Sequence, residues 1–253
     1  MSALLQSLQQ QRNQPRMEEL ALSTSISFFD IEGLDERQLL PFTEGMAREA
    51  FDRQSAAGFM VEKQSSRTIE GRYIRKLSLV NSGVDPFGDP YEVTTVEFVE
   101  QRFVIGVNRP QMILLNSSTS AKALTGRLSE FSNFSIAIAP VELAPDAIFQ
   151  EFDRRFENVR VYAAVVRDIK LAPTALVQLR FHASDDVRTH VRRFLGKRKI
   201  EFESLKIEFA YSGANRRAEI CSSGHIQVYG EYDPTLRDMA IETVSVLLRK
   251  SMP

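Results

Sequence analysis

The chain has 253 residues, of which 43% are hydrophobic and 26% are charged, and its formal net charge at pH 7 is −1. This composition is near the average for folded globular proteins, and the length allows one large domain or two small ones. A net charge so close to zero excludes a global attraction to nucleic acid or to anionic membranes.

Cys221 is the only cysteine, so an internal disulfide is impossible and a reducing compartment is expected. No stretch approaches the roughly 20 apolar residues of a membrane span. The N-terminus also lacks a charged region followed by an apolar core. We therefore expect a cytoplasmic protein that makes no contact with membranes.

The first 20 residues are rich in glutamine, and before Pro15 they contain a short apolar group formed by Leu4, Leu5 and Leu8. Two interpretations are open. The segment is a disordered tail, or it is a helix that docks on a protein partner through these leucines.

Residues 25–33 predict a strand, and residues 41–54 predict a helix whose inward side chains are Met46, Ala47, Ala50 and Phe51. Several runs rich in β-branched and aromatic residues then predict strands, at residues 73–80, 93–100, 102–107 and 111–115. A helix capped by Ser118 or a neighbour follows, with an inward face formed by Ala121, Leu124, Leu128 and Phe131.

A further helix is predicted from about Pro145, with inward side chains at Ile148, Phe149, Phe152 and Phe156. Strands are predicted at residues 159–166 and 174–182. Ser184 is a good N-cap for the next helix and Gly196 can end it. The buried stripe of that helix is expected to contain Val187, Val191, Phe194 and Leu195.

The end of the chain has the clearest pattern. Apolar residues alternate with polar ones over residues 205–211, as in a half-buried strand, and residues 216–220 and 225–228 complete a meander. Asp233 then offers an N-cap and Pro234 the first helical position. The helix that follows has an apolar stripe formed by Leu236, Met239, Ala240, Val244, Leu247 and Leu248.

These elements predict an α+β fold, mainly antiparallel β-meanders that are each followed by an amphipathic helix. The recurrence suggests two similar halves, residues 21–132 and 133–253, after the tail or docking helix of residues 1–20. Since any α+β protein shows passages from strand to helix, a single domain without a repeat is the alternative.

One segment is strongly basic. Residues 187–199 contain six cationic side chains and no acid, and these are Arg188, Arg192, Arg193, Lys197, Arg198 and Lys199. With the apolar stripe facing inward, they are expected to face solvent, where a phosphate backbone could bind them. The alternatives are a solvated face paired with neighbouring acids such as Glu201 or Glu203, or docking on an acidic protein surface.

A metal-dependent nuclease is one enzyme for which the residues offer a set. Asp146, Asp168 and Lys170 could hold a divalent metal on carboxylates while the lysine steadies the attacking water. The pattern is short and occurs by chance in chains rich in charge. Convergence of the three side chains would distinguish the two cases.

Other chemistry has no signature in this sequence. The three histidines lack metal-ligand spacing, no glycine-rich phosphate loop is found, and no serine-nucleophile elbow is present. No cofactor is therefore expected. The leading hypothesis is a non-catalytic intracellular adaptor or regulatory subunit with a protein partner. The alternative is a nucleic-acid-binding accessory protein that uses the basic segment 187–199. The sequence does not fix the oligomeric state.

Overall fold

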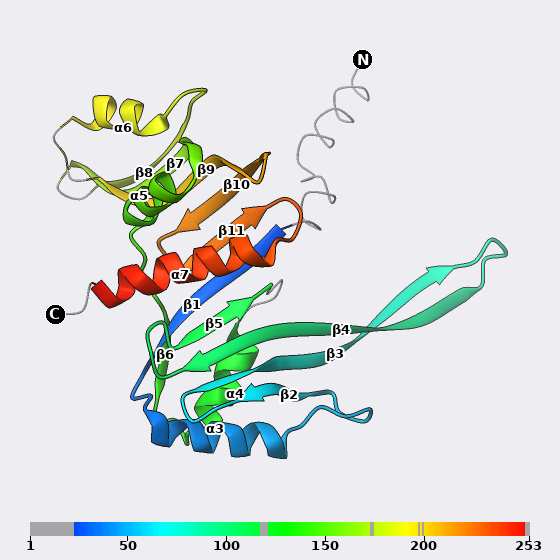
Figure 1. Ribbon diagram of the computed structural model, residues 1–253. Coiled ribbons are helices and arrows are strands. Elements are labelled where there is room, and N and C mark those ends of the chain that lie inside the picture. Colours follow the sequence, from blue (N-terminus) through cyan, green and yellow to red (C-terminus); the bar gives the residue numbers. More distant parts are fainter. Residues whose placement is uncertain (1–22, 117–120, 173–174, 197, 199, 251–253) are drawn as a thin grey trace. The chain divides into compact units, whose positions relative to one another are not determined.

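The computed structural model describes residues 23–116, 121–172, 175–196, 198 and 200–250 (Figure 1). The predicted docking residues Leu4, Leu5 and Leu8 lie outside the described residues. So do Ser118, Lys197 and Lys199. The described part of the chain contains five helices and eleven strands, which confirms the α+β class and the predominance of antiparallel sheet.

The strands follow one another by hydrogen bonding in the order β2-β3-β4-β5-β1-β11-β10-β9-β7-β8, and β6 also pairs with β1. The chain forms two compact units. The N-terminal unit is Ser27–Val141, and the C-terminal unit contains the described residues before and after it. Strand β1 (Ser23–Glu32) contributes its first four residues to the C-terminal unit and the rest to the N-terminal unit.

The N-terminal unit continues from β1 through α3 (Glu36–Arg48), β2 (Ala57–Gln64), β3 (Thr68–Val84), β4 (Pro90–Gly106), β5 (Met112–Leu115), α4 (Lys122–Phe131) and β6 (Ala137–Pro140). The pairs β2–β3, β3–β4, β4–β5 and β1–β6 are antiparallel. Its core joins both helices to the sheet, through buried side chains that include Phe42, Met46, Phe59, Phe103, Leu124 and Leu128.

The C-terminal unit contains α5 (Pro145–Arg155), β7 (Glu157–Ala172), β8 (Ala175–His182), α6 (Val187–Leu195), β9 (Glu201–Tyr211), β10 (Ala214–Cys221), β11 (His225–Tyr229) and α7 (Pro234–Lys250). Helix α5 packs on β7, β9, β10 and α7, while α6 packs on β7 and β8. The core side chains of β9 alternate as predicted, and Leu205, Ile207 and Phe209 are fully buried.

Helix α7 begins as its sequence predicts. The Asp233 carboxylate accepts hydrogen bonds from the backbone N–H groups of Thr235, at 2.8 Å, and Leu236, at 3.1 Å. The N-cap is therefore confirmed. The predicted stripe is confirmed at Leu236, Ala240, Val244 and Leu248, which are buried.

Several element boundaries differ from the predictions, since β3 and β7, for example, are longer than predicted. Three differences change which residues are buried or cap a helix. The strands predicted at residues 93–100 and 102–107 are one strand, β4. Gln101, the residue between them, continues the alternation and is buried opposite Tyr73. Helix α3 begins before Pro41 and ends at Arg48. Its inward residues are Leu39, Phe42 and Met46, whereas Ala47 and Ala50 are exposed.

The third difference is the start of α6. Asp186, not Ser184, is the N-cap, and its carboxylate accepts from the Arg188 backbone N–H at 2.9 Å. A carboxylate is both an acceptor and a negative charge at the positive end of the helix dipole. Gly196 ends the helix with φ 66°, as predicted.

Candidate functional site

The basic segment divides at Gly196. Arg188, Arg192 and Arg193 lie on α6, while Arg198 lies in the loop that leads to β9. The segment 187–199 is therefore not one continuous helix.

Arg188 is turned inward and does not belong to a free cationic surface. Its guanidinium group lies 3.7 Å from the centroid of the Phe149 ring on α5, and it also forms an ion pair of 2.5 Å with Asp186. Similarly, His190 lies 2.8 Å from Asp185. The acids that pair with this helix are thus the two that precede it.

Phe194 was predicted to be buried, but its side chain is 69% exposed. Val187, Val191 and Leu195 form the buried stripe, and Phe194 lies at its margin, where its ring contacts the edge of Phe181 on β8. We call Arg192, Arg193, Phe194 and Arg198 the basic surface. All four are exposed, and within the described residues no ion pair involves its arginines.

The three residues proposed for a nuclease are placed as follows. Asp146 lies in the first turn of α5. Asp168 lies at an irregularity of β7 with φ 57°, and its exposed carboxylate is 3.7 Å from Arg167. The backbone of Lys170 belongs to β7, but its side chain lies outside the described part. Convergence of the three therefore stays a prediction. Among the described residues, no group of three or more His, Cys, Asp or Glu side chains could hold a metal ion.

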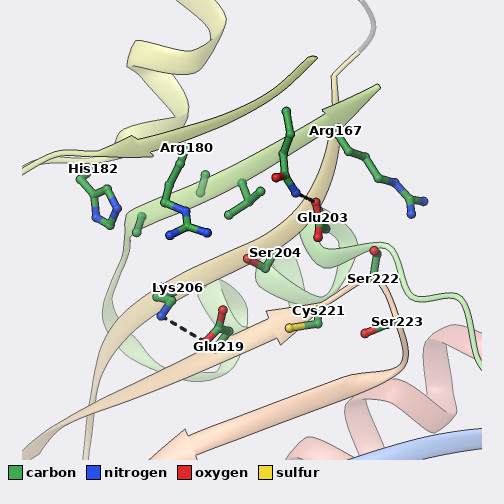
Figure 2. Close-up of a pocket in the computed structure, with 14 residues that line it drawn as sticks. Arg167, Arg180, His182, Glu203, Ser204, Lys206, Glu219, Cys221, Ser222 and Ser223 are labelled. Carbon is green, nitrogen blue, oxygen red and sulfur yellow. Dashed lines mark hydrogen bonds and ion pairs between the residues drawn. The ribbon is translucent and has the colours of Figure 1, made fainter. Parts of the chain in front are cut away.

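The sheet of the C-terminal unit has a polar cavity of about 400 Å³, formed across β7, β8, β9 and β10 (Figure 2). Side chains adjacent to the buried ones point into it, because neighbouring residues of a strand face opposite ways. Arg180 and His182 enter from β8, Ser204 and Lys206 from β9, and Glu219 and Cys221 from β10.

Glu219 lines this cavity, and its carboxylate accepts from two neighbouring side chains. Lys206 lies 3.2 Å from its carboxylate, and the Tyr229 hydroxyl donates to the same oxygen at 3.1 Å. Burial, together with the Glu219 charge and hydrogen bond, raises the pKa of Tyr229. Burial also raises the pKa of the Cys221 thiol to about 11. A thiol with this pKa is protonated at neutral pH and is a weak nucleophile.

The most exposed apolar surface lies elsewhere, on the hairpin of β3 and β4. Each strand has 17 residues, and they pair from Thr68 opposite Gly106 to Val84 opposite Pro90. The base of the hairpin is covered by β2, which pairs with β3 as far as Arg75, and by β5, which pairs with β4 from Arg102. Beyond these points the hairpin extends as a two-stranded ribbon (Figure 1).

We call residues 76–98 the arm. Eight of the fifteen large apolar side chains that are exposed in the described residues belong to it, and they are Leu79, Val80, Val84, Phe87, Tyr91, Val93, Val96 and Phe98. Directly paired residues share a face. Val80, Val84, Val96 and Phe98 therefore lie on one face and Leu79, Tyr91 and Val93 on the other. Both faces therefore carry exposed apolar side chains.

The tip of the arm has a defined conformation. The Asp85 carboxylate accepts hydrogen bonds from the backbone N–H groups of Phe87 and Asp89, each at 2.9 Å. Gly88 takes the positive φ of 92° that closes the turn. This arrangement presents Phe87, whose side chain is 91% exposed. The turn therefore holds an aromatic ring in water.

The sequence of the arm contains adjacent apolar residues, but this pattern alone did not predict that both faces of the two strands are exposed. Its strands were predicted as residues 73–80 and 93–100, but in both of them apolar side chains occupy adjacent positions. This pattern is also typical of strands buried on two faces. The cavity has no comparable local signal, since its side chains come from four strands.

No protein-family model matches the chain, and no curated protein matches it. None of the described helices combines the length and apolar character needed to cross a membrane.

Proposed function

We propose that this protein is a non-catalytic intracellular subunit of a protein complex, located in the cytoplasm, and that the arm is the surface by which it docks. The observation that carries the proposal is the concentration of exposed apolar side chains on a ribbon that no other described element covers. Contiguous apolar surface of this kind marks interaction sites.

The backbone of the arm supports the same function. The outer edge of β3 pairs with no other described strand beyond Arg75. The outer edge of β4 is likewise unpaired among the described strands from Pro90 to Gln101. Lys76 alone is tied back, through its N–H to the Ala56 carbonyl at 2.7 Å. Open strand edges are templates for pairing with another chain, and an isolated two-stranded hairpin is only marginally stable in water. A partner that covers the arm would stabilise it.

The test replaces the apolar tip and compares captured partners. A Val80→Ser, Val84→Ser, Phe87→Ser variant is prepared beside a control variant, Phe134→Ser, which removes an aromatic ring that is 74% exposed outside the arm. We expect the arm variant to lose specific partners in quantitative affinity capture from native cells, while the control retains them. The same partners at wild-type ratios on the arm variant would refute the proposal.

Hydrogen exchange provides the second readout. The amides of the arm are expected to exchange rapidly in the purified protein at the open edges, and to become protected when the captured complex is measured. Unchanged exchange in the complex would place the contact outside the arm.

A second candidate function is binding of a nucleic-acid backbone, and the exposure of Arg192, Arg193 and Arg198 favours it. Each phosphate neutralised by such a side chain releases a counterion, so affinity should fall steeply with salt. The test is fluorescence polarisation with labelled DNA and RNA across a salt series, beside a triple Arg→Glu variant at these positions. Equal binding by the variant would exclude this surface. Magnesium-dependent cleavage would be assayed only if binding is found.

We also propose that the two halves of the chain share one plan. The first half has the order β1-α3-β2-β3-β4-β5-α4, and the second has β6-α5-β7-β8-α6-β9-β10-β11-α7. Each half therefore begins with a strand and a helix and ends with strands followed by a helix, and the second half has α6 as an additional helix. Superposition of the two halves in an experimental structure tests this. Strands that do not align in chain order would contradict it.

A further inference from the structure

We infer that the arm of one copy docks on the basic surface of a second copy of this chain. The inference rests on the proposed function, in which the arm is a docking surface, and it names the partner. It follows from the distribution of charge, from the apolar side chains on both surfaces and from the residues that are already paired.

The arm is acidic as well as apolar. Residues 76–98 contain four acids, Asp85, Asp89, Glu92 and Glu97, and one lysine, Lys76, which gives a net charge of −3. Asp85 is committed to the turn at the tip. Within the described residues, no ion pair involves Glu92 or Glu97, so their charge is available to a partner.

This charge disfavours the simplest alternative, in which the arms of two copies pair edge to edge. Two arms would bring six net negative charges together, and like charges across an interface cost several kcal/mol. It also disfavours nucleic acid as the occupant of the arm. A cationic surface with exposed apolar groups is the complement that the arm requires.

The basic surface has this composition. Arg188 and His190 are paired with Asp186 and Asp185. Among the described residues of the segment, this leaves Arg192, Arg193 and Arg198 as the exposed cations. Phe194 supplies an exposed ring among them. Since the whole chain has a net charge of −1, the two surfaces represent a segregation of charge within a nearly neutral protein.

Because the arm and the basic surface are different surfaces of the same chain, the contact between them determines which assemblies can form. Two copies that exchange arms form a closed dimer with two identical contacts, and copies that do not reciprocate form a ring or an open chain. In either case the protein associates with itself, and the association weakens as salt rises because exposed charges carry part of it.

Analytical ultracentrifugation of the full chain tests the inference. An arm variant, Glu92→Lys with Glu97→Lys, makes both surfaces positive. A surface variant, Arg192→Glu, Arg193→Glu and Arg198→Glu, makes both negative, because three acids then outnumber Lys197 and Lys199. Each alone is expected to associate at least about tenfold more weakly than the wild-type chain, since tenfold corresponds to only ~1.4 kcal/mol. An equimolar mixture of the two restores opposite charges at every contact, and it should regain association as heterodimers.

The control variant, Glu44→Lys with Asp153→Lys, changes net charge as the arm variant does, at exposed positions outside both surfaces. It should associate as the wild-type chain does. Circular dichroism confirms that each variant is folded. A wild-type chain that stays monomeric at low salt, or a mixture that does not associate, overturns the inference.

The outcomes separate this inference from the proposed function. Suppose that the wild-type chain is monomeric but the Val80→Ser, Val84→Ser, Phe87→Ser variant still loses a captured protein. The arm then docks on a different partner, and only the inference fails. If the surface variant loses nucleic acid and leaves self-association unchanged, the basic surface binds nucleic acid and the inference is again overturned.

Discussion

The Arg188 guanidinium group packs over the Phe149 ring, 3.7 Å from its centroid, and forms an ion pair with Asp186. It joins α6 to α5 through one side chain. Of the arginines on α6, this one stabilises the fold, while Arg192 and Arg193 remain exposed.

Arg188→Ala should therefore lower the free energy of unfolding by about 1–2 kcal/mol, because it removes a partly desolvated cation–π contact and the partner of Asp186. Arg192→Ala and Arg193→Ala should each change it by less than about 0.5 kcal/mol. Urea unfolding followed by circular dichroism measures all three. Equal losses at the three positions would contradict this division.

Asp233→Ala should cost about 1 kcal/mol, because the Thr235 and Leu236 N–H groups lose their acceptor at the start of α7. The matched control is Asp153→Ala, which removes an exposed carboxylate from the last turn of α5, far from any N-cap, and should have little effect. Thermal unfolding of the pair is the measurement. If the control is destabilised as much, the N-cap is not the cause.

Two glycines should respond to alanine in opposite directions. A Cβ at Gly58 in β2 would lie 2.7 Å from the Phe51 Cα and 2.8 Å from the Glu49 carbonyl, so Gly58→Ala should destabilise by about 1–3 kcal/mol. A Cβ at Gly126 in α4 meets nothing within 4 Å, so Gly126→Ala should stabilise by about 0.5–1 kcal/mol. Denaturant midpoints that move in the same direction would refute the contrast.

The Cys221 thiol should react slowly with a disulfide reagent at pH 8 in the folded protein and rapidly in urea. Burial raises its pKa from 9.0 to about 11, so little thiolate is present at pH 8. The same shift implies that the thiol favours the folded state below pH 9 and that this contribution is lost as the pH rises through 11. Cys221→Ser should flatten the alkaline part of the stability profile. Fast labelling of the folded chain at pH 8 would show that the thiol is not shielded.

The sequence was sufficient for elements with local signals. Asp233 and Gly196 were predicted as helix boundaries because capping chemistry lies within a few residues of each boundary, and both were confirmed. The alternation in β9 likewise predicted Leu205, Ile207 and Phe209 as core.

Predictions that depended on tertiary packing were less successful. Phe194 fitted the helical period of a buried stripe, but the sheet covers only the narrower face around Val191. The polar residues at positions 100–102 suggested the end of a strand, because nothing local shows that Gln101 pairs opposite Tyr73. The arm and the cavity exist because neighbouring elements leave those strand surfaces uncovered. The periodicity of a sequence does not show which surfaces its neighbours cover.

The built turn at the end of the arm also determines how the chain would respond to a protease. Phe87 and Tyr91 are the exposed aromatic side chains nearest the tip, and a chymotrypsin-like enzyme cuts after such residues at exposed loops. Because β3 and β4 remain paired along their full length, a single cut there would leave both fragments in one folded molecule. The ends of the cut would lie at the tip, where a fused tag or inserted domain would disturb the two cores least.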